Sequence, residues 1–286
     1  MQPAPECCSV ADVIAVMDRL YPPGLAEDWD AVGLVCGDPK AHVRRILVAV
    51  DPTVEVAAEA VALGADMVIT HHPLFLRGVH GVPMSTPGGR VVSMLIGANC
   101  ALFAAHTNAD AAAPGVNDAL AAALGVGDLD VLEPTAPDAR TGIGRIGRLA
   151  AAESLATFAE RVARALPTTQ QGVRFAGPSE LPVQTVALCS GAGDSLLDLA
   201  AGSGADVYVT ADLRHHRALD HRAAGGCALV DVSHWASEWP WCEWAAAALQ
   251  VSLNDEFPHP ATTVGVTVTV STRPTDPWTG HVRSPR

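Results

Sequence analysis

Two adjacent histidines, His71 and His72, follow the apolar segment 67–70 and precede a proline. Imidazole nitrogens bind transition metals, and a strand that runs into a proline ends there. Residues 55–63 have the composition of a helix, and Gly64 supplies the turn after it, which predicts a βαβ unit. The pair is therefore expected at the carboxyl end of a strand, where open α/β sheets gather their ligands.

The chain repeats this arrangement. Residues 64–70, Gly-Ala-Asp-Met-Val-Ile-Thr, are echoed by residues 204–210, Gly-Ala-Asp-Val-Tyr-Val-Thr, each after a helical segment. Together with a second match described next, this predicts an internal duplication. We expect an α/β protein of two similar three-layer α/β domains, residues 1–135 and 136–286, with the segment 227–271 packing back at the domain interface.

The second match places a histidine and a carboxylate in each half. A Cys-Ala-Leu segment leads to His106 with Asp110 four residues on, and another leads to His234 with Glu238 four residues on. A lone His-His-Pro can merely end a strand, but two such His-x-x-x-acid elements favour a metal site.

A mixed shell of imidazole nitrogen and carboxylate oxygen suits Zn, Mn or Fe better than Ca. Neighbouring side chains on an extended segment diverge, so the two adjacent histidines are predicted to bind two different divalent metal ions. A carboxylate, Glu238 or Asp110, must then bridge the ions. His106 either binds a metal directly or orients Asp110, and the sequence favours neither. The predicted ligands are His71, His72, Asp110, His234 and Glu238.

Three further polar residues, Arg214, His215 and His216, follow the repeated strand and are the candidate substrate-binding residues. A solvated helix start explains them equally well. The glycines at 191 and 193 could cradle an anion, but a plain strand-to-helix turn is the favoured interpretation. The tryptophans around Glu238 are interpreted as core or interface residues.

Other segments are interpreted as connections. Residues 142–147 match the letters of a dinucleotide-binding loop but follow a proline-rich segment instead of a strand, so that interpretation is rejected. Residues 133–147 are expected to be a loop and the chain from Thr272 onward to be disordered. In Asp28-Trp29-Asp30 a carboxylate is expected to cap a turn, with a position in the cleft as the alternative.

Composition narrows the classes of function. The chain has 286 residues and a net charge of −13, so its field repels nucleic acid and anionic membranes. Seven cysteines without C-x-x-C spacing indicate reduced thiols. No apolar stretch is long enough to span a membrane and no leader is recognisable, so a cytoplasmic protein with a small-molecule substrate is expected.

These motifs together resemble the GTP cyclohydrolase 1 type 2 homologues, the Nif-three-like dinuclear metal-centre proteins. The resemblance spans most of the chain and rests on the following segments: Asp28-Trp29-Asp30 through Gly33-Leu34, Asp51-Pro52-Thr53, His71-His72-Pro73-Leu74, His106-Thr107-Asn108 with Asp110, Gly204-Ala205-Asp206 with Asp212, His215-His216, and Asp231 through His234 with Glu238. It implies the same five ligands of a two-metal centre, with Glu238 bridging, and a homo-hexameric ring. The chain departs from the family pattern at Ser233, where glycine is usual.

Two divalent ions would activate water for hydrolysis, so the predicted function is a metal-dependent hydrolase acting on a nucleotide or phosphate ester. Glu238 and His106 are its candidate catalytic residues. The assignment of a GTP-like substrate rests on the resemblance alone. The alternative is a non-enzymatic ring scaffold or regulatory protein that the metals stabilise.

Overall fold

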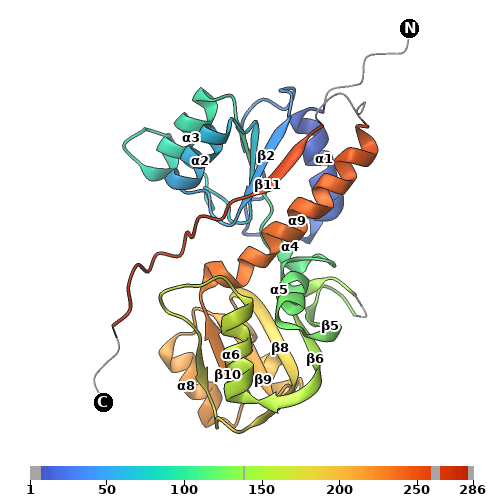
Figure 1. The fold of residues 1–286 in the computed structure, drawn as a ribbon, viewed down its shortest axis with the longest axis vertical. Coiled ribbons are helices and arrows are strands. Elements are labelled where there is room, and N and C mark those ends of the chain that lie inside the picture. Colours follow the sequence, from blue (N-terminus) through green and yellow to red (C-terminus); the bar gives the residue numbers. More distant parts are fainter. Residues whose placement is uncertain (1–7, 138, 259–264, 283–286) are drawn as a thin grey trace. The chain divides into compact units, whose positions relative to one another are not determined.

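The computed structural model describes residues 8–137, 139–258 and 265–282. Packing divides the chain into two compact units, Met1–Ala109 with Cys242–Thr275, and Asp110–Trp241 with Asp276–Arg286. Each unit contains one sheet with helices against it (Figure 1), which confirms the predicted α/β class. These units are defined by how the chain packs, so they do not test the domain boundary at residue 135 that the sequence predicts. That boundary stays a prediction.

The first unit holds a five-stranded sheet of order β1-β4-β3-β2-β11, in which β1 is antiparallel and the other strands are parallel. Its elements are α1 (Val10–Leu20), η1 (Pro23–Leu25), β1 (Gly33–Cys36), β2 (Arg45–Ala49), α2 (Val54–Leu63), β3 (Met67–Thr70), α3 (Pro87–Gly97), β4 (Ala101–Ala104) and β11 (Thr267–Val270). The short helix α4 (Thr107–Ala111) begins in this unit, and the long helix α9 (His234–Glu256) ends in it.

Alternating side chains of this sheet face two helical layers. Leu47, Val68 and Leu102 pack with α2 and α3 in one buried cluster. Side chains at intervening positions, such as Ile46 and Ile69, are equally buried and point to the opposite face, where α1 and the end of α9 lie in Figure 1. Strands buried on both faces explain why β2, β3 and β4 are almost continuously apolar.

The second unit holds a six-stranded sheet of order β5-β6-β8-β9-β10-β7, parallel only in β8, β9 and β10. Its elements are α5 (Val116–Leu124), β5 (Gly127–Pro134), β6 (Gly142–Ser154), α6 (Leu155–Ala165), β7 (Arg174–Ala176), β8 (Pro182–Ala192), η2 (Asp194–Leu196), α7 (Leu197–Gly202), β9 (Val207–Ala211), α8 (His215–Ala223) and β10 (Ala228–Val232). Helix α7 packs on one face of this sheet, and α5 and α6 contact β8.

The two echoed segments make the same contacts in their own sheets. The Asp66 carboxylate accepts hydrogen bonds from the amides of Arg44 and Arg45 at the start of β2. The Asp206 carboxylate accepts from Gln184 and Thr185 in β8 in the same way. Each aspartate thus accepts from two successive amides beside the neighbouring parallel strand, so the two segments share a structure as well as a sequence pattern, consistent with internal duplication.

The interpretation of residues 133–147 as a loop is wrong. Strand β5 continues to Pro134 and β6 starts at Gly142, so the two form an antiparallel pair joined by a short connection. The glycines of this segment permit that pairing: a Cβ at Gly142 would lie 2.1 Å from the Glu133 carbonyl oxygen, and one at Gly147 would lie 2.4 Å from the Gly127 carbonyl oxygen. Glycine therefore marks a close approach of two strands here.

Two sequence signals at helix ends are confirmed. Ser9 caps α1 through its hydroxyl, and Asp12 completes the capping box. Gly64 ends α2 in the left-handed conformation and β3 follows, as predicted. In the part of the chain that the structure describes, no helix is both long and apolar enough to cross a bilayer.

Candidate functional site

Three imidazoles form a cluster in the first unit. His71 and His72 follow the carboxyl end of β3, and His106 follows that of the neighbouring strand β4. Their ring centroids lie 5.0, 5.2 and 5.4 Å apart, and one nitrogen from each ring lies within 4.8 Å of the others. The strand-tip position predicted for the pair is therefore correct, and His106 lies beside it.

Each of these rings is oriented by an oxygen atom at Nδ1. The acceptor is the Ala105 carbonyl for His71 at 2.9 Å, the Asp51 carboxylate for His72 at 2.7 Å and the Asp30 carboxylate for His106 at 2.8 Å. An Nδ1–H that donates to such an oxygen leaves the ring lone pair on Nε2, which is the form that ligates metals. The three rings thus have the outer contacts of metal-binding histidines.

Asp30 is the most tightly held of these acceptors. Its side chain is fully buried and accepts hydrogen bonds from His106, from the Thr107 amide and from the Thr107 hydroxyl. Burial by itself would raise the pKa of the Asp30 carboxyl, but these hydrogen bonds outweigh it and hold the pKa below its ordinary value. Asp30 therefore stays ionised and fixes both His106 and the first residue of α4, Thr107.

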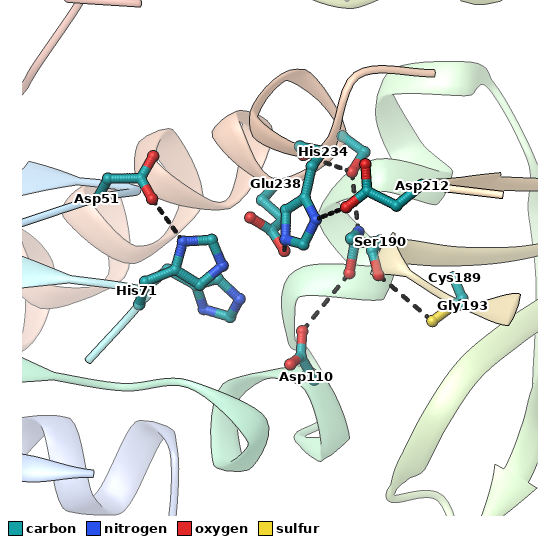
Figure 2. Close-up of polar contacts among 12 residues, drawn as sticks. Asp51, His71, Asp110, Cys189, Ser190, Gly193, Asp212, His234 and Glu238 are labelled. Carbon is teal, nitrogen blue, oxygen red and sulfur yellow. Dashed lines mark hydrogen bonds and ion pairs between the residues drawn. The ribbon is translucent and has the colours of Figure 1, made fainter. Parts of the chain in front are cut away.

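The second unit offers a histidine and a carboxylate on one helix. His234 is the first residue of α9 and Glu238 lies one turn later, so both side chains project from the same face, with His234 Nε2 and Glu238 Oε1 2.9 Å apart. Glu238 is 3% exposed. His234 Nδ1 donates to Asp212 at 2.7 Å (Figure 2), which repeats the carboxylate–imidazole pattern of the first unit.

Gly191 makes room for these two side chains. It has a φ of +60°, its amide donates to the Ser237 hydroxyl, and an added Cβ would lie 2.4 Å from Glu238 Oε1 and 3.0 Å from His234 Nε2. The sequence favours a plain strand-to-helix turn for the Gly191–Gly193 segment. Its glycine also serves the site, because only glycine fits both the backbone conformation and the space.

Asp110, the remaining predicted ligand, lies in α4 and accepts hydrogen bonds from residues of β8 and α5. Its carboxylate accepts a long hydrogen bond of 3.5 Å from the Ser190 hydroxyl (Figure 2), and its carbonyl accepts from the Asn117 side chain at 3.0 Å. Asn117 also accepts from the Ser190 amide. Burial and the charge of Asp110 raise the pKa of the adjacent Cys189 thiol, which keeps it a neutral thiol.

The three candidate substrate-binding residues are consecutive: Arg214 directly precedes α8, and His215 and His216 are its first two residues. Arg214 pairs with Asp194, and its side chain is largely exposed. The His215 and His216 rings contact each other edge to face at 5.1 Å, and both residues are exposed. His215 lines a cavity of about 540 Å³ with Phe175, Leu219 and other residues of β7, β10 and α8. Their role in substrate binding stays a prediction.

The C-terminal segment contributes a residue that the sequence interpretation missed. Residues 272–282 have no regular secondary structure, but the expected disorder is wrong for Arg273, which pairs with Glu59, and for Thr275. The Thr275 hydroxyl donates to the second oxygen of Asp51, the carboxylate that orients His72. The sequence gives no signal for this contact, because the two residues lie at opposite ends of the chain.

Replacing Thr275 with valine removes that hydroxyl at nearly constant volume. Loss of an outer carboxylate partner weakens metal binding by about 10- to 100-fold, and Thr275 is one contact further out, so we expect a smaller loss than for Asp51→Asn. The measurement is the metal dissociation constant in competition with a chelating indicator. Thr272→Val, at an exposed position three residues earlier, is the control; equal affinities of the two valine variants would contradict the role of Thr275.

Comparison with known proteins is consistent with this geometry. A family model described as Duf34/NIF3 (NGG1p interacting factor 3) matches residues 8–277. A "GTP cyclohydrolase 1 type 2 homolog" of Streptomyces coelicolor is 49% identical over 280 residues, 96% of this chain and 95% of that protein. One of Mycobacterium tuberculosis is 36% identical and covers 94% of this chain and 96% of its own length.

Solved structures have the same fold. A Bacillus cereus protein related to NIF3 superposes with a TM-score of 0.87 at 26% identity, covering 96% of this chain and 99% of its own. A Staphylococcus aureus hypothetical protein superposes with a TM-score of 0.85 at 29% identity, covering 96% and 99%. The fold predicted from the resemblance is thereby confirmed.

Proposed function

Because the chain belongs to the Duf34/NIF3 family, we propose that it binds two divalent metal ions, Zn, Mn or Fe, through His71, His72, Asp110, His234 and Glu238, and that it is a metal-dependent hydrolase of a nucleotide or phosphate ester. One observation carries the proposal. In four histidines, those at 71, 72, 106 and 234, the Nδ1–H group donates to an oxygen atom. In three of them this oxygen belongs to a carboxylate. Histidines oriented in this way are typical of metal ligands.

The donor chemistry fits such ions. Imidazole nitrogen with carboxylate oxygen suits Zn, Mn and Fe. Bound divalent ions would supply a Lewis acid and lower the pKa of water. The chain's own residues orient the ligands: Asp51, Asp30 and Asp212 fix the imidazoles, and Gly191 leaves space for the donor atoms of His234 and Glu238.

His106 and Glu238 are the proposed catalytic residues. The Nδ1–H of His106 donates to the buried carboxylate of Asp30, which leaves a lone pair on Nε2. His106 can therefore accept and return a proton at Nε2 while Asp30 holds the ring. Glu238, buried beside His234, can accept a proton from a nucleophile or hold an ion.

The test is Glu238→Gln, which keeps the side-chain shape and removes the charge. We expect the metal content of the untagged protein, measured by elemental analysis, to fall, and the turnover of a panel of nucleotides and phosphate esters with Mn, Zn or Fe to drop by about 10²- to 10⁴-fold. Circular dichroism and the melting temperature should stay near those of the wild type. Glu243→Gln, at an exposed position of the same helix, is the matched control.

A metal-stabilised scaffold predicts a different result. Glu238→Gln would then change the mass of the assembly, measured by light scattering, while no ester in the panel is turned over by the wild type. A wild type that contains no transition metal and binds none tightly would refute the metal proposal as a whole.

A further inference from the structure

Trp29 is an exposed aromatic residue beside the imidazole cluster. Its side chain is 56% exposed, whereas Trp235 and Trp241 are 6% and 1% exposed. Its ring centroid lies 5.9 Å from that of His106 at an interplanar angle of 79°. An edge-to-face contact covers at most one face of the indole, so the other face is available to a flat ligand.

The chain holds Trp29 in this exposed position. On its C-terminal side Asp30 is anchored by the three hydrogen bonds from His106 and Thr107. On its N-terminal side the Glu27 amide donates to the Thr107 hydroxyl, and the Asp30 amide donates to the Glu27 carbonyl. The loop that carries Trp29 is thus fastened on both sides to the start of α4, and the indole is positioned before any ligand arrives.

A fixed, exposed indole suits one class of ligand. Every nucleobase has a flat π face, and stacking of such a ring on an aromatic side chain is tolerant of the base's identity. The net charge of −13 disfavours a nucleic-acid polymer, which leaves a single nucleotide or nucleoside as the ligand. Phosphate esters without an aromatic ring gain no stacking contact with the indole.

We propose that Trp29 stacks on the planar nitrogen heterocycle of the substrate and so selects nucleotides over simple phosphate esters. The inference rests on the proposed function, because it names the substrate class of the site that contains His106. Trp29 is a specificity-determining residue here and is not one of the proposed metal ligands.

The test measures binding to the full-length, metal-loaded protein by calorimetry, with guanosine monophosphate, adenosine monophosphate and ribose 5-phosphate as probes. Stacking of one base is expected to make both nucleotides bind about 5- to 150-fold more tightly than ribose 5-phosphate. Trp29→Ala should abolish that preference, Trp29→Phe should retain most of it, and ribose 5-phosphate should bind all variants equally. Trp278→Ala, at a tryptophan that is 62% exposed, is the control and should keep the preference.

Other outcomes refute the proposal. It fails if the wild type shows no preference for nucleotides, if no probe binds, or if Trp29→Ala changes the mass of the assembly by light scattering and leaves nucleotide affinity intact. Metal content and ester turnover, measured on the same samples, separate this failure from that of the proposed function. If the protein binds metal and hydrolyses esters but does not prefer nucleotides to ribose 5-phosphate, only the role of Trp29 is refuted.

Discussion

Gly191→Ala is expected to remove metal from the His234–Glu238 pair while the protein stays folded. The new Cβ would lie 2.4 Å from Glu238 Oε1 and 3.0 Å from His234 Nε2, both well inside van der Waals contact. The Glu238 carboxylate is the end of a flexible side chain, so it moves away instead of the backbone. Because ligand geometry must be held within a fraction of an ångström, this displacement should weaken metal binding by at least about 100-fold.

The measurement is metal content by elemental analysis, together with the dissociation constant of the remaining ion. Alanine at a φ of +60° also strains the backbone by about 1–2 kcal/mol, so a control must carry the same strain. Gly204→Ala does so: its φ is +79°, and nothing lies within 4 Å of an added Cβ. That variant should bind metal like the wild type and lose only stability.

The two glycine variants give the same outcome if the ligand assignment is wrong. If Gly191→Ala and Gly204→Ala bind metal with the same affinity as the wild type, His234 and Glu238 are not ligands, since neither can keep its position beside the new methyl group. Such a result would leave the first unit's imidazole cluster as the candidate site among the residues that the structure describes.

The sequence predicts the parts of this protein that depend on short segments. Strand β3, the Gly64 turn and the Ser9 cap follow from side chains within a few residues of one another, and all three are observed. The echo of residues 64–70 at 204–210 is visible for the same reason. Asp66 and Asp206 then turn out to make equivalent contacts with the neighbouring strand, which no local pattern reveals.

The outer contacts of the candidate ligands are mostly hidden from the sequence. Asp30 lies 76 positions from His106, and Thr275 lies 224 positions from Asp51. No periodicity links such pairs, because only the fold brings them together. Conversely, glycine and proline between 133 and 147 predict a loop, although the glycines permit the close pairing of β5 with β6.

Arg145, within that misinterpreted segment, has the largest predicted effect on stability. It is 2% exposed, and its guanidinium donates five hydrogen bonds, two to the Asp118 carboxylate and one each to the carbonyls of Gly142, Gly144 and Ala112. All five N–H groups are therefore satisfied. Removing one partner of a buried ion pair costs about 3–5 kcal/mol, because the other charge stays buried without compensation.

Arg145→Met should lower the free energy of unfolding by that amount, measured by urea denaturation followed by circular dichroism. Arg148→Met, at an exposed position of the same strand, is the matched control and should change it by less than about 0.5 kcal/mol. Adding Asp118→Asn to Arg145→Met removes the uncompensated carboxylate, so the double variant should be less destabilised than the sum of the single changes. Strict additivity would show that the pair does not act as a unit.

The same variant should also loosen a candidate ligand. Arg145 holds the Ala112 carbonyl, two residues after Asp110, while Asn117, next to Asp118, holds the Asp110 carbonyl. Both restraints on the Asp110 segment thus depend on the start of α5, which Arg145 fixes through Asp118. Metal affinity of Arg145→Met, measured well below its unfolding transition, should therefore fall, whereas that of Arg148→Met should not. A destabilised variant with wild-type metal affinity would show that Arg145 serves the fold alone.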